Sequence, residues 1–219
     1  MRILIAGATG LVGQGVLHEV LAHPGDDRIG LLGRRSSGCT DPRAEELLVP
    51  AFDALEPVAE RLGGWDACFY CAGAPPIGTP EPDYRHVTVD LTLQVARAYA
   101  ERNPQGRFLY VSGAHADPGS RFMPMRIKGE AEAALQALPI TTVMLRPGGI
   151  QPAHGERSPH AWMRPFYAIG GPLMGVGVRL LPTVMTSTAA VGRAMLALAA
   201  MPTPPAIVEN ADINRLGTA

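Results

Sequence analysis

The sequence predicts an α/β fold, a doubly wound parallel sheet covered by helices on both faces. Short apolar, β-rich runs alternate with segments of helical periodicity, which is the pattern of parallel strands joined by crossover helices. The first of these runs enters a glycine-rich turn that opens a helix. The 219 residues, 47% of them hydrophobic, suffice for one core, and no repeat or low-complexity linker interrupts them. We therefore expect one domain over residues 1–219, in which residues 151–185 form a small substrate lobe or lid.

The elements follow from periodicity and from helix-ending residues. The first strand is expected at residues 2–6, a run of aliphatic side chains. Apolar residues then recur at helical spacing from Leu11 to Leu21, until His23-Pro24-Gly25 ends that helix. Thr186, Ser187 and Thr188 offer N-caps for the last helix. Further strands are expected at 28–33 and near 47–50, 67–71, 107–112 and 141–145, and helices near 54–62, 85–102, 126–137 and 187–200.

Charge and cysteine content restrict the class of protein. With 19 basic and 20 acidic residues, the chain lacks the broad basic face of a nucleic-acid binder. Its three cysteines, Cys39, Cys68 and Cys71, are too few for a disulfide-stapled secreted fold. Cys68 and Cys71 form a CxxC inside an expected strand, where residues three apart point to opposite faces, so a redox or metal pair is not expected. With no signal-peptide pattern and no apolar run of roughly 20 residues, we expect a cytoplasmic protein without a transmembrane segment.

The strongest motif is the glycine turn Gly7-Ala8-Thr9-Gly10-Leu11-Val12-Gly13. It follows the first strand and opens the first helix, where glycines allow the backbone to approach a pyrophosphate whose charge meets the helix N-terminus. The alternative is that these glycines serve only the turn and the packing of helix on strand. The position favours a Rossmann-type dinucleotide site, with Gly7, Thr9, Gly10, Leu11, Val12 and Gly13 as cofactor-binding residues.

The residues after the second strand bear on which dinucleotide is bound. A site selective for NAD usually places an acidic residue there to hold the ribose 2′-hydroxyl, whereas this chain has Arg34 and Arg35. A guanidinium can grip a 2′-phosphate bidentately, so the pair favours NADP over NAD. The alternative is two solvated loop arginines. Asp53, just past the third expected strand, offers a partner for the adenine amino group or an N-cap for the next helix.

Taken together, the motifs resemble those of the atypical short-chain dehydrogenase/reductases, specifically small NAD(P)-binding proteins of the epimerase/dehydratase-like type. The resemblance covers nearly the whole chain. It implies that Ala72, Gly73 and Pro147 lie at the cofactor. The motifs that carry it are GATGLVG at 7–13, Cys71-Ala72-Gly73, Tyr110-Val111-Ser112-Gly113-Ala114, Arg126-Ile127-Lys128-Gly129-Glu130, the run 145–152 and the tail 208–213.

The resemblance implies hydride transfer, with a tyrosine four residues before a lysine as proton donor and a serine that polarises the substrate carbonyl. Here Pro124 stands where that tyrosine would be, and proline has no ionisable group. Ser112 is present, but the second serine found in many relatives is replaced by Gly113. Lys128, the one lysine beside 18 arginines, keeps the position that bonds the nicotinamide ribose, against the alternative of an exposed helix lysine.

A catalytic protein of this type would need a substitute proton donor. His115, on the loop after Ser112, is the first candidate, and Tyr84, His154 and Tyr167 are others, each also explicable as a loop or packing residue. Two function classes stay open. One is an NADP(H)-dependent oxidoreductase or epimerase-like enzyme acting on a small molecule, with Ser112, Lys128 and His115 at the reacting centre. The other is a non-catalytic NADP(H) sensor or regulatory protein. The mixed polar and aromatic residues of the expected lobe suit a pocket, and Trp162 and Phe166 alternatively suit packing on the sheet or on a second subunit of a homodimer.

Overall fold

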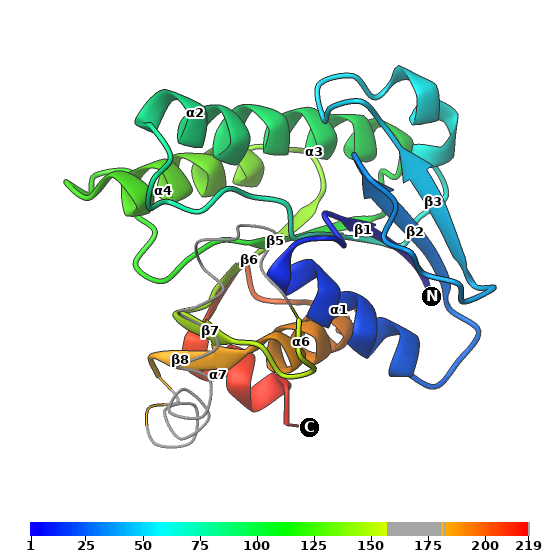
Figure 1. The fold of residues 1–219 in the computed structure, drawn as a ribbon. Coiled ribbons are helices and arrows are strands. Elements are labelled where there is room, and N and C mark those ends of the chain that lie inside the picture. Colours follow the sequence, from blue (N-terminus) through cyan, green and yellow to red (C-terminus); the bar gives the residue numbers. More distant parts are fainter. Residues whose placement is uncertain (157–180, 182, 219) are drawn as a thin grey trace.

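The computed structural model describes residues 1–156, 181 and 183–218, and it confirms the predicted doubly wound sheet (Figure 1). Within these residues seven strands form one sheet in the order β3-β2-β1-β4-β5-β6-β9, and each neighbouring pair is parallel. A separate small sheet pairs β7 (Gly149–Gln151) with β8 (Met185–Ser187). The seven strands are β1 (Arg2–Ala6), β2 (Arg28–Gly33), β3 (Ala44–Leu48), β4 (Ala67–Tyr70), β5 (Arg107–Val111), β6 (Thr141–Arg146) and β9 (Ile207–Glu209).

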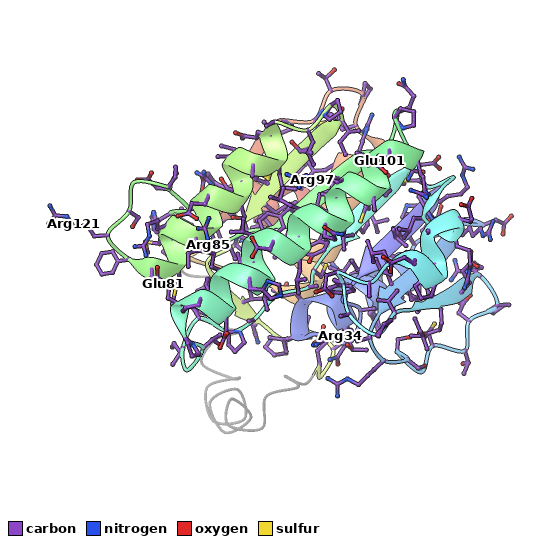
Figure 2. The ribbon with its side chains drawn as sticks, turned by 90° about the horizontal axis from the view of Figure 1, so that it is seen from above. Arg34, Glu81, Arg85, Arg97, Glu101 and Arg121 are labelled. Carbon is purple, nitrogen blue, oxygen red and sulfur yellow. The ribbon has the colours of Figure 1, made fainter. Side chains whose placement is uncertain are left out.

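Two helical layers cover the sheet, and each seals its own hydrophobic cluster. One layer holds α1 (Leu11–Ala22), α6 (Thr188–Ala200) and α7 (Asn210–Leu216), seen below the sheet in Figure 1. Figure 2 looks onto the other layer, in which α3 and α4 lie side by side. This second layer comprises the 3-10 helix η1 (Glu56–Leu62), α2 (Glu81–Arg85), the π-helical turn η2 (His86–Asp90), α3 (Leu91–Arg102) and α4 (Met123–Gln136).

The order of the strands fixes where a ligand can enter. The chain lays down β1, β2 and β3 toward one edge and then returns to add β4 on the other side of β1. The connections after β1 and β4 therefore leave the sheet in opposite directions, which opens a crevice at the carboxyl ends of these two strands. The predicted glycine turn, at residues 7–13, lies at this crevice.

Burial explains which elements the sequence revealed. The central strands β1 and β4 are buried on both faces and read as continuous apolar runs, so they were predicted correctly. The edge strand β3 was predicted near 47–50 but spans Ala44–Leu48. The N-terminal part of β3 carries Glu45, which pairs with Arg28 and Arg61 and interrupts the apolar pattern.

Other boundaries also differ from the expectation. The helix expected near 54–62 is the 3-10 helix η1, and the one expected near 85–102 begins at Glu81 and contains the π-helical turn η2. Ser187 caps α6, as predicted, by accepting a hydrogen bond from the backbone N–H of Ala190 at 3.0 Å. The short strands β7, β8 and β9 and the helix α7 were not predicted. Residues 157–180 and 182 lie outside the described residues, so the expected lobe at 151–185 is described only at its two ends.

The two cysteines of the CxxC face opposite sides of the sheet, as the strand pattern predicts. Cys68 is buried in the cluster beneath α3 and α4, whereas Cys71 packs against the cluster beneath α1 and α6. Burial raises the pKa of the Cys71 thiol to about 12. In the part of the chain that the structure describes, no helix is both long and apolar enough to cross a bilayer.

Candidate functional site

Gly7 and Gly13 are required by the fold itself. Gly7 has a φ of +85°, and a Cβ there would lie 2.7 Å from the backbone N and Cα of Ala72. A Cβ at Gly13 would collide with the carbonyl oxygen of Gly7. These two glycines therefore serve the turn and the packing of α1 against β1, whatever the site binds.

Gly10 is different, because the protein leaves room for a side chain there. A Cβ at Gly10 would have one neighbour within 4 Å, the Gly7 carbonyl oxygen at 3.4 Å, and its φ is an ordinary −78°. Gly10 is also the N-cap of α1, where no side chain caps the helix and the first turn holds no acidic residue. The backbone N–H groups of Leu11 and Val12 belong to the first turn, whose donors have no partner within the helix. The start of α1 is thus an open site for an anion.

Gly73 and Gly113 extend this open space along the sheet edge. A Cβ at either position would meet nothing within 4 Å, and neither residue has a positive φ. Among the glycines that the structure describes, these two alone combine open space with a backbone that any residue adopts. They follow β4 and β5, so with Gly10 they line the carboxyl ends of three adjacent strands. We call the space in front of Gly10, Gly73 and Gly113 the glycine cradle. Side chains at these positions would fill it, whereas with glycines it has room for an extended ligand such as a dinucleotide.

Arg34 and Arg35 lie just beyond β2 with both side chains exposed, and Figure 2 labels Arg34. Within the described chain, no hydrogen bond or ion pair engages either guanidinium group. The nearby Glu46 carboxylate accepts instead from the Ser37 backbone N–H at 2.9 Å and the Ser37 hydroxyl at 2.7 Å. The loop is therefore held by serines, which leaves the two arginines available to an anionic ligand.

Asp53 is exposed and does not cap the following helix, because η1 has Leu55 as its N-cap and no side-chain cap. The N-cap alternative for Asp53 was wrong, whereas its contact with adenine stays a prediction. Ala72 lies against Gly7, and the Pro147 carbonyl accepts a hydrogen bond from the Ala114 backbone N–H at 2.8 Å. Thr9 accepts through its carbonyl from Gln14 Nε2 at 3.0 Å.

Lys128 is held in place rather than free on the surface of α4. Its Nζ donates to the Tyr110 hydroxyl at 3.0 Å and to the Val111 carbonyl at 3.1 Å, and it lies 4.7 Å from the centroid of the Tyr110 ring. Burial lowers the pKa of Lys128 to about 8, although Glu132 opposes the shift. This half-buried lysine contradicts the alternative of an exposed helix lysine, and its contact with the Val111 carbonyl places the ammonium at the end of β5.

Ser112 is buried, and its hydroxyl is already engaged. It donates to Glu132 Oε1 at 2.5 Å. The same carboxylate accepts from Arg146, through Nε at 3.0 Å and through Nη2 to Oε2 at 2.6 Å. Because a serine hydroxyl has a single proton to donate, this arrangement directs that proton into the protein and away from a substrate. Glu132, four residues after Lys128 and so on the same face of α4, was not predicted, although helical spacing carried the signal.

The candidate proton donors are scattered. Pro124 occupies the first turn of α4, where proline is well tolerated, and donates nothing. His115 is exposed on the loop after β5 with a φ of +60°. Tyr84 is 2% exposed and packs in the core, where burial raises the pKa of its phenol. His154 pairs with Glu19 on α1, and Tyr167 lies outside the described residues. Of these, His115 is the one on a loop at the carboxyl edge of β5.

The site is an open cradle at the carboxyl edge of a doubly wound sheet, and comparison with known proteins shows the family of the chain. The model of the NAD dependent epimerase/dehydratase family matches residues 3–133. The chain belongs to this family.

Its relatives include mitochondrial proteins of fungi and a mammalian protein. The protein FMP52 of Saccharomyces cerevisiae is 31% identical over 172 residues, which cover 72% of this chain and 68% of that protein. The protein fmp52 of Emericella nidulans is 29% identical over 175 residues, covering 76% and 74%. The protein HTATIP2 of Rattus norvegicus is 27% identical over 169 residues, covering 75% and 69%.

Solved structures share the fold at lower identity. MoeE5 in complex with UDP-glucuronic acid and NAD matches with a TM-score of 0.68 and 16% identity, covering 95% of this chain and 75% of that one. The UDP-glucuronic acid 4-epimerase of Bacillus cereus in complex with NAD matches with a TM-score of 0.66 and 14% identity, covering 95% and 76%. At this identity, the likeness concerns the fold alone.

Proposed function

We propose that the protein binds NADP(H) along the carboxyl edge of β1, β4 and β5, and that it acts as an oxidoreductase or epimerase-like enzyme on a small molecule. The observation that carries this proposal is the open space at Gly10, Gly73 and Gly113 in front of the uncapped start of α1. No packing requirement explains a glycine at these three positions, whereas a ligand that touches the backbone does.

Each part of the cofactor has a partner of suitable chemistry. The N–H groups of Leu11 and Val12 would receive the pyrophosphate, and the two guanidinium groups of Arg34 and Arg35 would receive the 2′-phosphate. Lys128 would bond the hydroxyls of the nicotinamide ribose, because Tyr110 and Val111 hold its ammonium at the end of β5. A bound nicotinamide supplies the capacity to accept or donate a hydride.

The solved structures that share the fold support the binding of a dinucleotide, but the preference for NADP over NAD rests on residues of this chain alone. Two of the structures that share the fold are named as complexes with NAD. An acidic side chain after β2 would suit the free 2′-hydroxyl of NAD, whereas this chain has two exposed arginines there. His115 completes the proposed reacting centre as the proton donor, because its exposed ring lies on the loop after β5, three residues beyond Ser112, whose own hydroxyl donates to Glu132.

A specific observation favours a second function, a non-catalytic NADP(H) sensor. The resemblance implies two hydroxyl donors, of which one is replaced by Pro124 and the other, Ser112, donates to Glu132. A protein that only senses the cofactor needs the cradle and Lys128 but neither donor. Absorbance of NADPH at 340 nm separates the two functions: substrate-dependent oxidation in a panel of carbonyl compounds, quinones and nucleotide sugars indicates the enzyme, and tight binding without turnover indicates the sensor.

Two alanine variants test the cradle itself. Gly73→Ala and Gly113→Ala add a methyl group where the protein has nothing within 4 Å, so the melting temperature should not fall. The affinity for NADPH should fall at least tenfold, because the methyl group occupies space assigned to the cofactor. Gly63→Ala is the matched control, since its Cβ would make an ordinary contact at 3.6 Å, away from the site. Unchanged NADPH affinity in both test variants would overturn the proposed site.

A further inference from the structure

A second group of chemistry-bearing side chains lies where α1, α6 and the stretch after β7 meet. His18 and Glu19 belong to the second half of α1, and His154 follows β7. At 1.5 Å per residue, Glu19 lies about 13 Å along the helix from Gly10, so this cluster is separate from the start of α1. Nothing in the proposed nucleotide site uses these three residues.

The three side chains converge. His154 Nε2 lies 2.7 Å from Glu19 Oε1, and the rings of His154 and His18 stack with centroids 3.8 Å apart and an interplanar angle of 16°. One ligand atom from each residue can be chosen so that all three lie within 4.8 Å of one another. Ligands on a tetrahedral ion with bonds of about 2.0–2.1 Å are roughly 3.4 Å apart. Because the lone pair of an imidazole lies in the plane of its ring, one of the two stacked, exposed rings must turn out of the stack before both nitrogens face one ion.

The carboxylate of this cluster is oriented by an outer contact. Glu19 is buried, and its Oε2 accepts from Arg193 Nη1 of α6 at 3.2 Å. This contact leaves Oε1 directed at His154. Metal-binding carboxylates and imidazoles are commonly fixed by such hydrogen bonds from outside the ligand set, because these bonds set the orientation before an ion arrives.

The backbone of His154 is also anchored. Its N–H donates to Glu156 Oε2 at 2.8 Å, while Glu156 Oε1 accepts from the Thr188 hydroxyl at 2.5 Å. Gly15 of α1 allows Glu156 to lie this close to the helix, because a Cβ at residue 15 would lie 2.6 Å from Glu156 Oε1. Figure 1 shows the chain after β7 returning to α1 and α6. His154 is thus held over α1 by contacts that do not involve its ring.

We propose that His18, Glu19 and His154 form a binding site for one divalent transition-metal ion, with Zn²⁺ the best-matched ion. Two imidazole nitrogens and one carboxylate oxygen suit zinc and its neighbours better than they suit Mg²⁺ or Ca²⁺, which take oxygen ligands. Three protein ligands leave one coordination position for water or an external ligand. The ion would replace the direct contact between His154 and Glu19 and would fasten residues 153–156 to α1.

Calorimetric titration of tag-free, chelator-stripped protein with ZnCl₂ tests the site. One equivalent of Zn²⁺ should bind, and His18→Ala and His154→Ala should each weaken binding at least tenfold. Both rings are exposed, so truncating them removes little packing, and circular dichroism verifies the fold. His86→Ala is the matched control, because His86 also contacts a carboxylate, Asp90 at 3.3 Å, but no second histidine joins this pair among the residues that the structure describes. Cys39→Ser is the control for binding by a half-exposed thiol.

Titration with Co²⁺ gives a second readout that reports coordination. Bound Co²⁺ should show visible absorption bands of a four- or five-coordinate ion, and His154→Ala should remove them. The proposal is overturned if no stoichiometric Zn²⁺ binding is found, or if binding survives in both His18→Ala and His154→Ala. Loss of binding in Cys39→Ser alone would also overturn it, since the ion would then reside on a thiol. None of these outcomes depends on nucleotide binding.

Discussion

The two ends of the candidate nucleotide site are built in opposite ways. Around β1, β2 and β4 the protein leaves open the space at Gly10 and Gly73, the first N–H groups of α1 and the exposed side chains of Arg34 and Arg35. Around β5 and α4 it ties its polar groups together, Ser112 to Glu132 and Lys128 to Tyr110. The groups proposed to bind a nucleotide are thus open, whereas Ser112, to which the resemblance assigns a catalytic role, already donates its proton within the protein.

The largest expected effect is a loss of stability at the end near β5 and α4, where Ser112 and Glu132 are hydrogen-bonded to each other. Glu132→Ala removes the carboxylate that satisfies the buried Ser112 hydroxyl and the Arg146 guanidinium, and breaking such a buried pair costs about 3–5 kcal/mol. Urea unfolding should show this loss of stability. Glu209→Ala, which removes only the exposed partner of Arg146, should cost about 1 kcal/mol or less. Equal, small losses in both variants would mean that the two ends do not differ as described.

The next effect separates the two kinds of glycine at the open end. Gly7→Ala places a side chain on a positive φ and against the backbone of Ala72, so it should lower the free energy of unfolding by about 1–3 kcal/mol or more. Gly73→Ala should leave the free energy of unfolding unchanged within about 0.5 kcal/mol, while it lowers the affinity for NADPH. Thermal or urea unfolding of both variants measures the contrast. A stability loss in Gly73→Ala as large as that in Gly7→Ala would show that packing, and not a ligand, requires both glycines.

A smaller, selective effect is expected from the arginines. The double variant Arg34→Ala/Arg35→Ala should bind NADPH roughly 10–100-fold more weakly, because it loses one or two charge-assisted contacts to the 2′-phosphate. NADH affinity should stay within about twofold, because NADH has no 2′-phosphate. Arg97→Ala, which removes an exposed arginine of α3 labelled in Figure 2, is the control for charge alone. Parallel titrations with both nucleotides measure the ratio of the two affinities. An equal loss of affinity for NADH would show that the arginines do not act on the 2′-phosphate.

The smallest effect concerns the titration of Lys128. Its folded-state pKa of about 8 lies below the ordinary 10.5, so between these values the unfolded chain binds more protons than the native protein. The contribution of Lys128 to stability therefore rises with pH from about 8. Cys68, which is buried, and Cys71, which is half-buried, have raised thiol pKa values and oppose this trend near and above pH 9, the ordinary thiol pKa. The melting temperature of wild type minus that of Lys128→Met should thus increase between pH 8 and 9, and a flat difference would contradict the lowered pKa.

The sequence predicted the interior of the fold better than its margins. Strands such as β2, buried from Ile29 to Leu32, are apolar throughout and have clear boundaries. The edge strand β3 and the three-residue β9 carry glutamates, half-buried in β3 and exposed in β9, so their composition resembles that of loops. Helix α7 has seven residues, too few for a periodicity to emerge.

The candidate site was predictable as a set of positions but not as a set of contacts. The structure confirms the predicted place of the glycine turn between β1 and α1, because that motif depends on local sequence, and it shows that Lys128 is not an exposed helix lysine. Whether a glycine is required by packing depends on a neighbour such as Ala72, which is 65 residues from Gly7. Likewise, the pairing of Ser112 with Glu132 depends on how α4 rotates over β5, which no local pattern specifies.

The central claim is that the open end binds a phosphorylated dinucleotide. Calorimetric titration of nucleotide-stripped protein with NADPH, NADP, NADH and NAD in parallel tests it most directly. We expect NADPH and NADP to bind at least tenfold more tightly than their unphosphorylated counterparts, with one site per chain. Equal affinity for NADH and NADPH would contradict the role of Arg34 and Arg35, and absence of binding by all four would contradict the cradle itself.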